Sequence, residues 1–142
     1  MSTASPARLY AMIAGVVLVA AGILGFFYEP AFSSDPSVRS PVLGILDTNG
    51  FHNVVHIATG VLGILAARTV SSARTYCLLF GSVYHVVAIW GFALGGDGSI
   101  LSIIPVNTED SVLHLILSAG GFAAYAASAP STGRASARPA VG

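Results

Sequence analysis

The sequence has very few charged residues for its length. Asp, Glu, Lys and Arg make up only 8% of the 142 residues, and lysine is absent. A small soluble domain needs roughly a quarter of its residues charged to cover its surface. Six basic and six acidic residues also leave no net positive charge for a phosphate backbone. The composition therefore excludes an ordinary soluble domain and argues against nucleic-acid binding.

Cysteine is also scarce, since Cys77 is the only one. A single cysteine excludes a disulfide framework or a four-cysteine metal knuckle within one chain. Hydrophobic residues, in contrast, reach 54%. They form four runs without Arg, Asp or Glu, each close to the ~20 residues with which a helix crosses a bilayer. These runs are 9–28, 51–67, 76–94 and 111–127.

The four runs predict an all-α fold, a bundle of four transmembrane helices. They are continuous rather than alternating, which disfavours a transmembrane β-barrel. All six acidic residues and Arg39 fall in the loops after the first and third runs. By the positive-inside rule, both termini are expected in the cytoplasm and the bundle in a plasma membrane. The other five arginines are all on the cytoplasmic side of this topology: Arg8, Arg68, Arg74, Arg134 and Arg138.

This topology divides the chain into three parts. A short tail (1–8) precedes the transmembrane domain (9–128), and a Ser/Ala/Pro-rich tail (129–142) is expected to be flexible. A signal peptide is the alternative interpretation of the first run, but no small-x-small cleavage site precedes its bulky end. Apolar residues 42–46 are expected to cover one end of the bundle. The loop 95–110 is expected to hold a short interfacial or re-entrant segment.

Polar and small residues line one face of three of the runs. At 100° per residue, His52, His56 and Gly60 share a face of the second run, and Asp110 and His114 share one in the fourth. A similar ridge in the third run contains Gly81 and His85. Small residues allow close helix packing in lipid, so these faces are expected to point inward.

The four histidines carry the functional hypothesis, because all of them fall in the outer half of the predicted membrane. His52 and His56 are four residues apart on one helix face, a spacing that suits two imidazoles on one transition-metal ion. His114 and His85 would complete the site from facing helices, with Asn53 and Asp110 as partners of the ligands. The sequence thus predicts a polar pocket that binds a metal ion or one haem, and assigns no catalytic residue.

Other interpretations remain open. Neutral histidines can hydrogen-bond across helices and fix the bundle register, in which case the protein is an accessory or scaffold subunit that binds another membrane protein or a second copy of itself. A third interpretation is a proton or small-solute relay, although polar groups are sparse in the inner half. The His52–His56 spacing also resembles the zinc-protease helix, but Asn53 stands where that motif needs a glutamate base. An enzyme is therefore less expected than a binding protein.

Two sequence blocks resemble an uncharacterised family of small four-span membrane proteins common in actinobacteria, which carries a domain-of-unknown-function label. They are Asn49-Gly50-Phe51-His52-Asn53-Val54-Val55-His56 and Pro105-Val106-Asn107-Thr108-Glu109-Asp110-Ser111-Val112-Leu113-His114. The resemblance covers most of residues 9–127, implies the fold and the location, and implies no known reaction. Many relatives are expected to have Asn where this chain has Ser111. In the second block, Asn107 or Thr108 is also the expected N-cap of the last helix.

Overall fold

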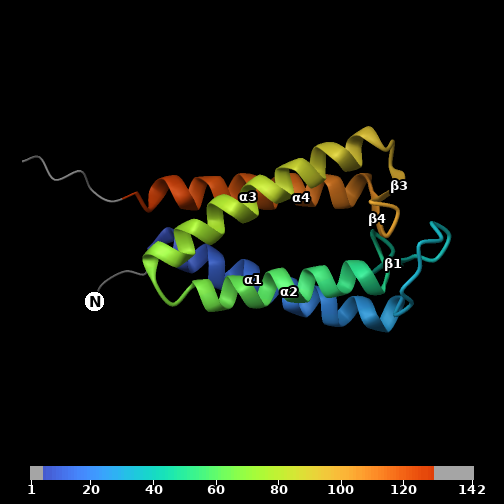
Figure 1. Cartoon of the computed structure of the whole chain (residues 1–142), viewed down its shortest axis with the longest axis horizontal. Coiled ribbons are helices and arrows are strands. Elements are labelled where there is room, and N and C mark those ends of the chain that lie inside the picture. Colours follow the sequence, from blue (N-terminus) through green and yellow to red (C-terminus); the bar gives the residue numbers. More distant parts are fainter. Residues whose placement is uncertain (1–4, 130–142) are drawn as a thin grey trace, which may run out of the picture.

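The computed structural model describes residues 5–129, which form four helices along one long axis. They are α1 Pro6–Tyr28, α2 Gly50–Ala66, α3 Val70–Ala93 and α4 Thr108–Ala127. The helices run in alternating directions, so the start of α1 and the end of α4 lie at the same end of the molecule (Figure 1). The predominantly helical class and the four predicted helices are confirmed. Most of the two predicted tails lies outside the described residues.

The two long connections are β-hairpins, which the sequence interpretation did not predict. β1 Ser40–Val42 pairs antiparallel with β2 Leu46–Thr48, and β3 Asp97–Ile100 pairs with β4 Ile104–Asn107. Both hairpins lie at the end opposite the described termini (Figure 1). The loop expected to be interfacial or re-entrant therefore forms a folded cap. Val106 is 1% exposed and anchors this second hairpin to the bundle.

Close backbone contact joins the helices in two pairs, α1 with α2 and α3 with α4. A Cβ atom on Gly15 would lie 2.7 Å from the carbonyl oxygen of Gly60, and a Cβ on Gly60 would lie 2.6 Å from that of Gly15. In the second pair, the Ser118 hydroxyl donates to the carbonyl of Gly81 at 2.8 Å. Glycine and serine at these points allow the close approach that holds helices together in lipid.

Arginine side chains close the end of the bundle where the described termini lie. Arg8 Nε donates to the carbonyl of Ala67 at 2.8 Å, and Arg74 Nη1 donates to that of Ser128 at 2.7 Å. These bonds satisfy carbonyl groups at the C-terminal ends of α2 and α4, where cations are favourable. Arg68, in the link between α2 and α3, lies at the same end, while the predicted cytoplasmic residues beyond 129 lie outside the described part.

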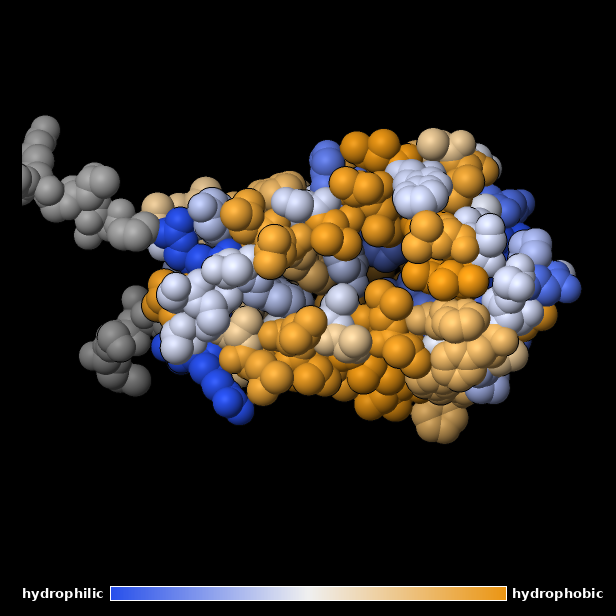
Figure 2. Space-filling view, viewed as in Figure 1, coloured by the Kyte–Doolittle hydropathy of each residue, from blue (hydrophilic) through white to orange (hydrophobic). Residues whose placement is uncertain are grey.

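The outward faces of the helices are apolar. Phe27 is 82% exposed, Val86 61% and Leu62 59%. Figure 2 shows hydrophobic residues along the sides of the bundle and hydrophilic residues gathered toward its two ends. Helices α1 and α3 are long and apolar enough to cross a membrane, and only a third of each apolar window is buried. So much exposed apolar surface is unusual for a soluble monomer.

The Gly15–Gly60 contact yields a stability prediction. Gly60→Ala places a methyl group against backbone that cannot rotate away, so we expect a loss of about 1–3 kcal/mol. Thermal unfolding in detergent, followed by circular dichroism, measures this loss as a lower Tm. Ala58→Leu is the control, because Ala58 is exposed on the outer face of the same helix. A Gly60→Ala variant as stable as the wild type would contradict the packing described here.

Candidate metal centre

Helices α2 and α4, which carry three of the four predicted ligands, each begin at an asparagine N-cap. Asn49 Oδ1 accepts from the backbone N–H of His52 at 3.0 Å. Asn107 Oδ1 accepts from the N–H of Asp110 at 2.8 Å, while the Asp110 carboxylate accepts from the N–H of Asn107 at 3.1 Å. The second pair of bonds is a capping box, which satisfies two backbone donors at the helix start. The prediction that Asn107 or Thr108 caps the last helix is confirmed, for Asn107.

The same two asparagines also bind the hairpins to each other. Asn49 Nδ2 donates to the carbonyl of Ile103 in the second hairpin, at 2.8 Å. Asn107 Nδ2 donates to the carbonyl of Ile45 in the first hairpin, at 2.6 Å. We call these two bonds the asparagine clasp. Because each asparagine also begins a helix, the clasp fixes the separation between the first turns of α2 and α4.

A salt bridge network also joins the two hairpins. Arg39 Nη1 lies 3.4 Å from the Asp47 carboxylate and Nη2 lies 3.2 Å from that of Asp97, so one arginine links both hairpins. Burial raises the pKa of Asp47 above its usual value, and the charge of Arg39 opposes this. The arginine therefore helps keep Asp47 ionised in a partly buried position.

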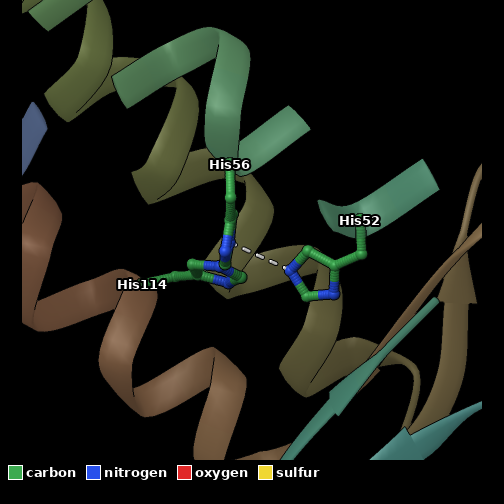
Figure 3. Close-up of side chains that lie close together, drawn as sticks. All are labelled: His52, His56 and His114. Carbon is green, nitrogen blue, oxygen red and sulfur yellow. Dashed lines mark hydrogen bonds between the residues drawn. The ribbon is translucent and has the colours of Figure 1, made fainter. Parts of the chain in front are cut away.

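Three of the four predicted ligands converge below the clasp. One ring nitrogen from each of His52, His56 and His114 lies within 4.8 Å of the others. Nε2 of His52 and Nε2 of His56 are 3.1 Å apart. Figure 3 shows the three imidazoles approaching one another, two from α2 and one from α4. Among residues 5–129 this is the one group of three or more side chains arranged to hold a metal ion.

The convergent imidazoles are largely buried. His52 and His114 are 3% and 4% exposed. Nδ1 of His52 and Nδ1 of His114 are both buried without a hydrogen-bond partner. A buried polar atom left unpaired costs about 1–3 kcal/mol, so a water molecule, an ion or a functional role is needed to account for it. The donor set consists of nitrogen alone, with no carboxylate or thiol in the group.

Two small cavities adjoin the imidazoles. One, of about 80 Å³, lies between α2 and α3, and its lining includes the three histidines, Thr59 and Tyr84. The Tyr84 hydroxyl lies 3.3 Å from Thr59 Oγ1. Figure 2 shows a hollow between the two helix pairs with hydrophilic atoms at its floor. These residues place hydroxyl groups and imidazoles around one small volume.

The second cavity, of about 30 Å³, is lined by His52, His56, Asn53 and Asp110 among others. It has room for about one water molecule. The cavity brings the two residues predicted as partners of the ligands next to the histidines, although none of their hydrogen bonds in the structure goes to an imidazole.

Asn53 and Asp110 bond to backbone and hairpin groups instead. Asn53 Oδ1 accepts from the hydroxyl of Thr48, and its Nδ2 donates to the carbonyl of Glu29 at 3.0 Å. The Asp110 carboxylate accepts from the N–H of Asp47 at 3.0 Å, in addition to closing the capping box. Burial raises the pKa of Asp110, which precedes the fourth apolar run, to about 7, and the two N–H groups oppose the rise. Both side chains therefore position the ends of helices around the histidines.

His85, the fourth predicted ligand, lies apart from the other three. It is exposed on α3, with Nδ1 3.4 Å from Ser118 Oγ and its ring against Phe122. The preceding residue, Tyr84, is buried, and its ring faces His114 edge-on at 5.1 Å between centroids. One residue is a rotation of 100° about the helix axis, so the buried tyrosine turns His85 away from the group.

The sequence interpretation missed Asn49 and Arg39 as residues that shape the site. Asn49 lies within the quoted first block, but its type alone does not reveal that the side chain reaches the opposite hairpin. Arg39 has no sequence signal beyond being the one arginine among the acidic loops.

Comparison with known proteins places the chain in a family. No curated protein and no solved structure matches it. One family model, described as a domain of unknown function (DUF4383), matches residues 8–127. This range begins at the third residue of α1 and ends with α4, and it contains both hairpins and the three convergent histidines. The chain therefore belongs to the DUF4383 family of domains of unknown function.

Proposed function

We propose that the protein binds one transition-metal ion in a pocket at the extracytoplasmic end of a four-span bundle. The observation that carries the proposal is the convergence of His52, His56 and His114 from two helices. Nitrogen ligands at 2.0–2.1 Å from a tetrahedral ion are about 3.3 Å apart. The Nε2 atoms of His52 and His56 are already 3.1 Å apart. Binding thus requires adjustment mainly of the third imidazole.

The donor set supports an ion such as zinc, copper, nickel or iron, because imidazole suits these metals whereas magnesium and calcium prefer oxygen. Three protein ligands leave a fourth coordination position free for water or another small molecule. The cavity of about 80 Å³ beside the imidazoles supplies space for it. A haem is the less favoured ligand, because pockets for organic cofactors usually measure about 300–1,000 Å³.

Three features support placement across a plasma membrane with both termini in the cytoplasm. The sides of the bundle are apolar, and two of the helices have the length and hydropathy of membrane spans. Arg8, Arg68 and Arg74 gather at one end, whereas the acidic residues lie at the hairpin end, as the positive-inside rule requires. The 17 residues of α2 measure about 26 Å, so the hairpins would cover its outer end near the membrane surface.

The metal proposal is tested on protein purified in mild detergent without chelators. We expect about one equivalent of Zn²⁺ or Co²⁺ per chain by elemental analysis, and visible absorption bands from bound Co²⁺. Two variants remove ligands: the double variant His52→Ala/His56→Ala and the single variant His114→Ala. Loss of a residue that only supports a ligand typically weakens metal binding by about 10–100-fold, and each of these variants should weaken it by more.

His85→Ala is the matched control, because it removes an imidazole outside the convergent group, and it should bind metal as the wild type does. Equal losses in the control and in the ligand variants would refute the three-histidine site. A Soret band that disappears in the double variant would replace the ion with haem. A metal-free wild type, whose histidine variants lose only stability, would support the accessory-subunit interpretation.

The proposed orientation is tested by cysteine labelling in whole cells, in a Cys77→Ser background. Ser34→Cys lies in an exposed loop at the hairpin end, and Ser71→Cys is exposed in the first turn of α3. A membrane-impermeant maleimide is expected to label Ser34→Cys in intact cells and Ser71→Cys only after permeabilisation. The opposite pattern would invert the topology, and labelling of both in intact cells would contradict a membrane-spanning bundle.

A further inference from the structure

The first and third helices carry the same sequence pattern. Residues 6–28 and 72–94, shifted by 66 positions, are identical at eight of 23 positions. The shared segments are Ala-Arg-x-Tyr at 7–10 and 73–76, Gly-x-Val at 15–17 and 81–83, and Ile-x-Gly-Phe at 23–26 and 89–92. The same shift places all seven buried residues of α1 on the seven buried residues of α3. The two helices therefore bury equivalent faces.

The hairpins and the helices that follow them repeat with a shift of 58. Residues 41–66 and 99–124 are identical at seven of 26 positions, which include the cap asparagines and the pair His56 and His114. Both hairpins turn through two residues with positive φ, Leu43 and Gly44 in the first and Leu101 and Ser102 in the second, again 58 apart. The smaller shift is accommodated by a longer connection between α1 and β1.

Contacts between the two halves are reciprocal. In the asparagine clasp, Asn49 donates to Ile103 and its equivalent Asn107 donates to Ile45, the equivalent of Ile103. The Tyr10 hydroxyl donates to the carbonyl of Leu117, and its equivalent Tyr76 donates to that of Thr59, which corresponds to Leu117. When residue i contacts j and the equivalent of j contacts the equivalent of i, the halves are related by a two-fold axis. Since the helix pairs run in the same direction, this axis follows the length of the bundle.

We infer that the chain is a tandem duplication of one helix–hairpin–helix unit, and that the position shared by His52 and Asp110 determines the ligand set of the site. The second part rests on the proposed metal binding. His56 and His114 are equivalent residues whose ring centroids are 6.2 Å apart across the axis. His52 lies beside them, and its equivalent in the second unit is Asp110. The two units thus share one pair of equivalent imidazoles, His56 and His114, and differ at the position of His52 and Asp110.

The difference at this position fixes where the ion lies. His52 adds its imidazole to the pair of equivalent imidazoles, whereas the Asp110 carboxylate is held by the backbone N–H groups of Asp47 and Asn107. Asp110 faces the cavity of about 30 Å³ that it shares with His52 and His56. The site therefore takes two imidazoles from the first unit, His52 and His56, and one from the second, His114, so the proposed ion lies on the His52 side of the axis.

Exchange of the two residues tests the inference in the full chain. His52→Asp alone should weaken Co²⁺ binding by at least about tenfold. The exchange variant His52→Asp/Asp110→His supplies the third imidazole from the equivalent place, and should recover affinity to within about tenfold of the wild type. Circular dichroism and size-exclusion elution should first show that the exchange variant folds as the wild type does. If this folded variant binds Co²⁺ no better than His52→Asp, the inference about the shared position is wrong.

Two tyrosine variants test the duplication without metal and without altering Asp110. Tyr10→Phe and Tyr76→Phe each remove one hydroxyl-to-carbonyl bond between the units, so both should lower Tm by a similar amount, about 2–8 °C. Tyr28→Phe, at the exposed end of α1, is the control and should leave Tm unchanged. A decrease confined to one of the two variants would overturn the duplication. Matched decreases in a protein that binds no metal would support it and reject only the proposed function.

Discussion

The asparagine clasp determines how the rest of the hairpin end is arranged. Asn49 and Asn107 each begin a helix, and each donates to a carbonyl of the opposite hairpin. His56 and His114 both follow their cap asparagine by seven residues. The bonds that set the hairpin contact therefore also set the distance between these two imidazoles. The hydrogen bonds of the clasp and the helix caps therefore hold these two imidazoles in place. A preorganised binding site requires such a supporting shell around its ligands.

The proposed membrane location explains why the interior is more polar than the outward faces. The buried positions of α1 are occupied by Ala, Gly and one Leu, while its larger apolar side chains point outward. Between helices in lipid, close backbone contact and hydrogen bonds replace the hydrophobic driving force. The buried histidines, Asn53 and Asp110 consequently stabilise the bundle as well as forming a pocket. Loss of metal in a histidine variant is meaningful only beside a measured Tm.

The sequence predicts the helices well, because run length and the absence of charge define them almost without tertiary information. The cap at Asn107 follows from its place two residues after Pro105. The hairpins escape prediction because Leu43, Leu101 and Ser102 adopt positive φ without the Asn-Gly signature typical of such turns. The sequence pattern groups His85 with the other histidines, because a polar stripe on one helix does not specify how that helix is rotated toward its neighbours. The buried Tyr84 decides that rotation.

A duplicated unit also gives a reason for the proposed three-ligand site. Two identical units around an axis supply ligands in pairs, so three imidazoles require that the copies differ. Within one chain the copies can diverge, as His52 and Asp110 have. The same divergence affects the cavity beside the site, since Thr59 and Tyr84 correspond to Leu117 and Leu18 in the other half. The hydroxyl groups of Thr59 and Tyr84 thus line the larger cavity between α2 and α3, and we place the free coordination position of the proposed ion on that side.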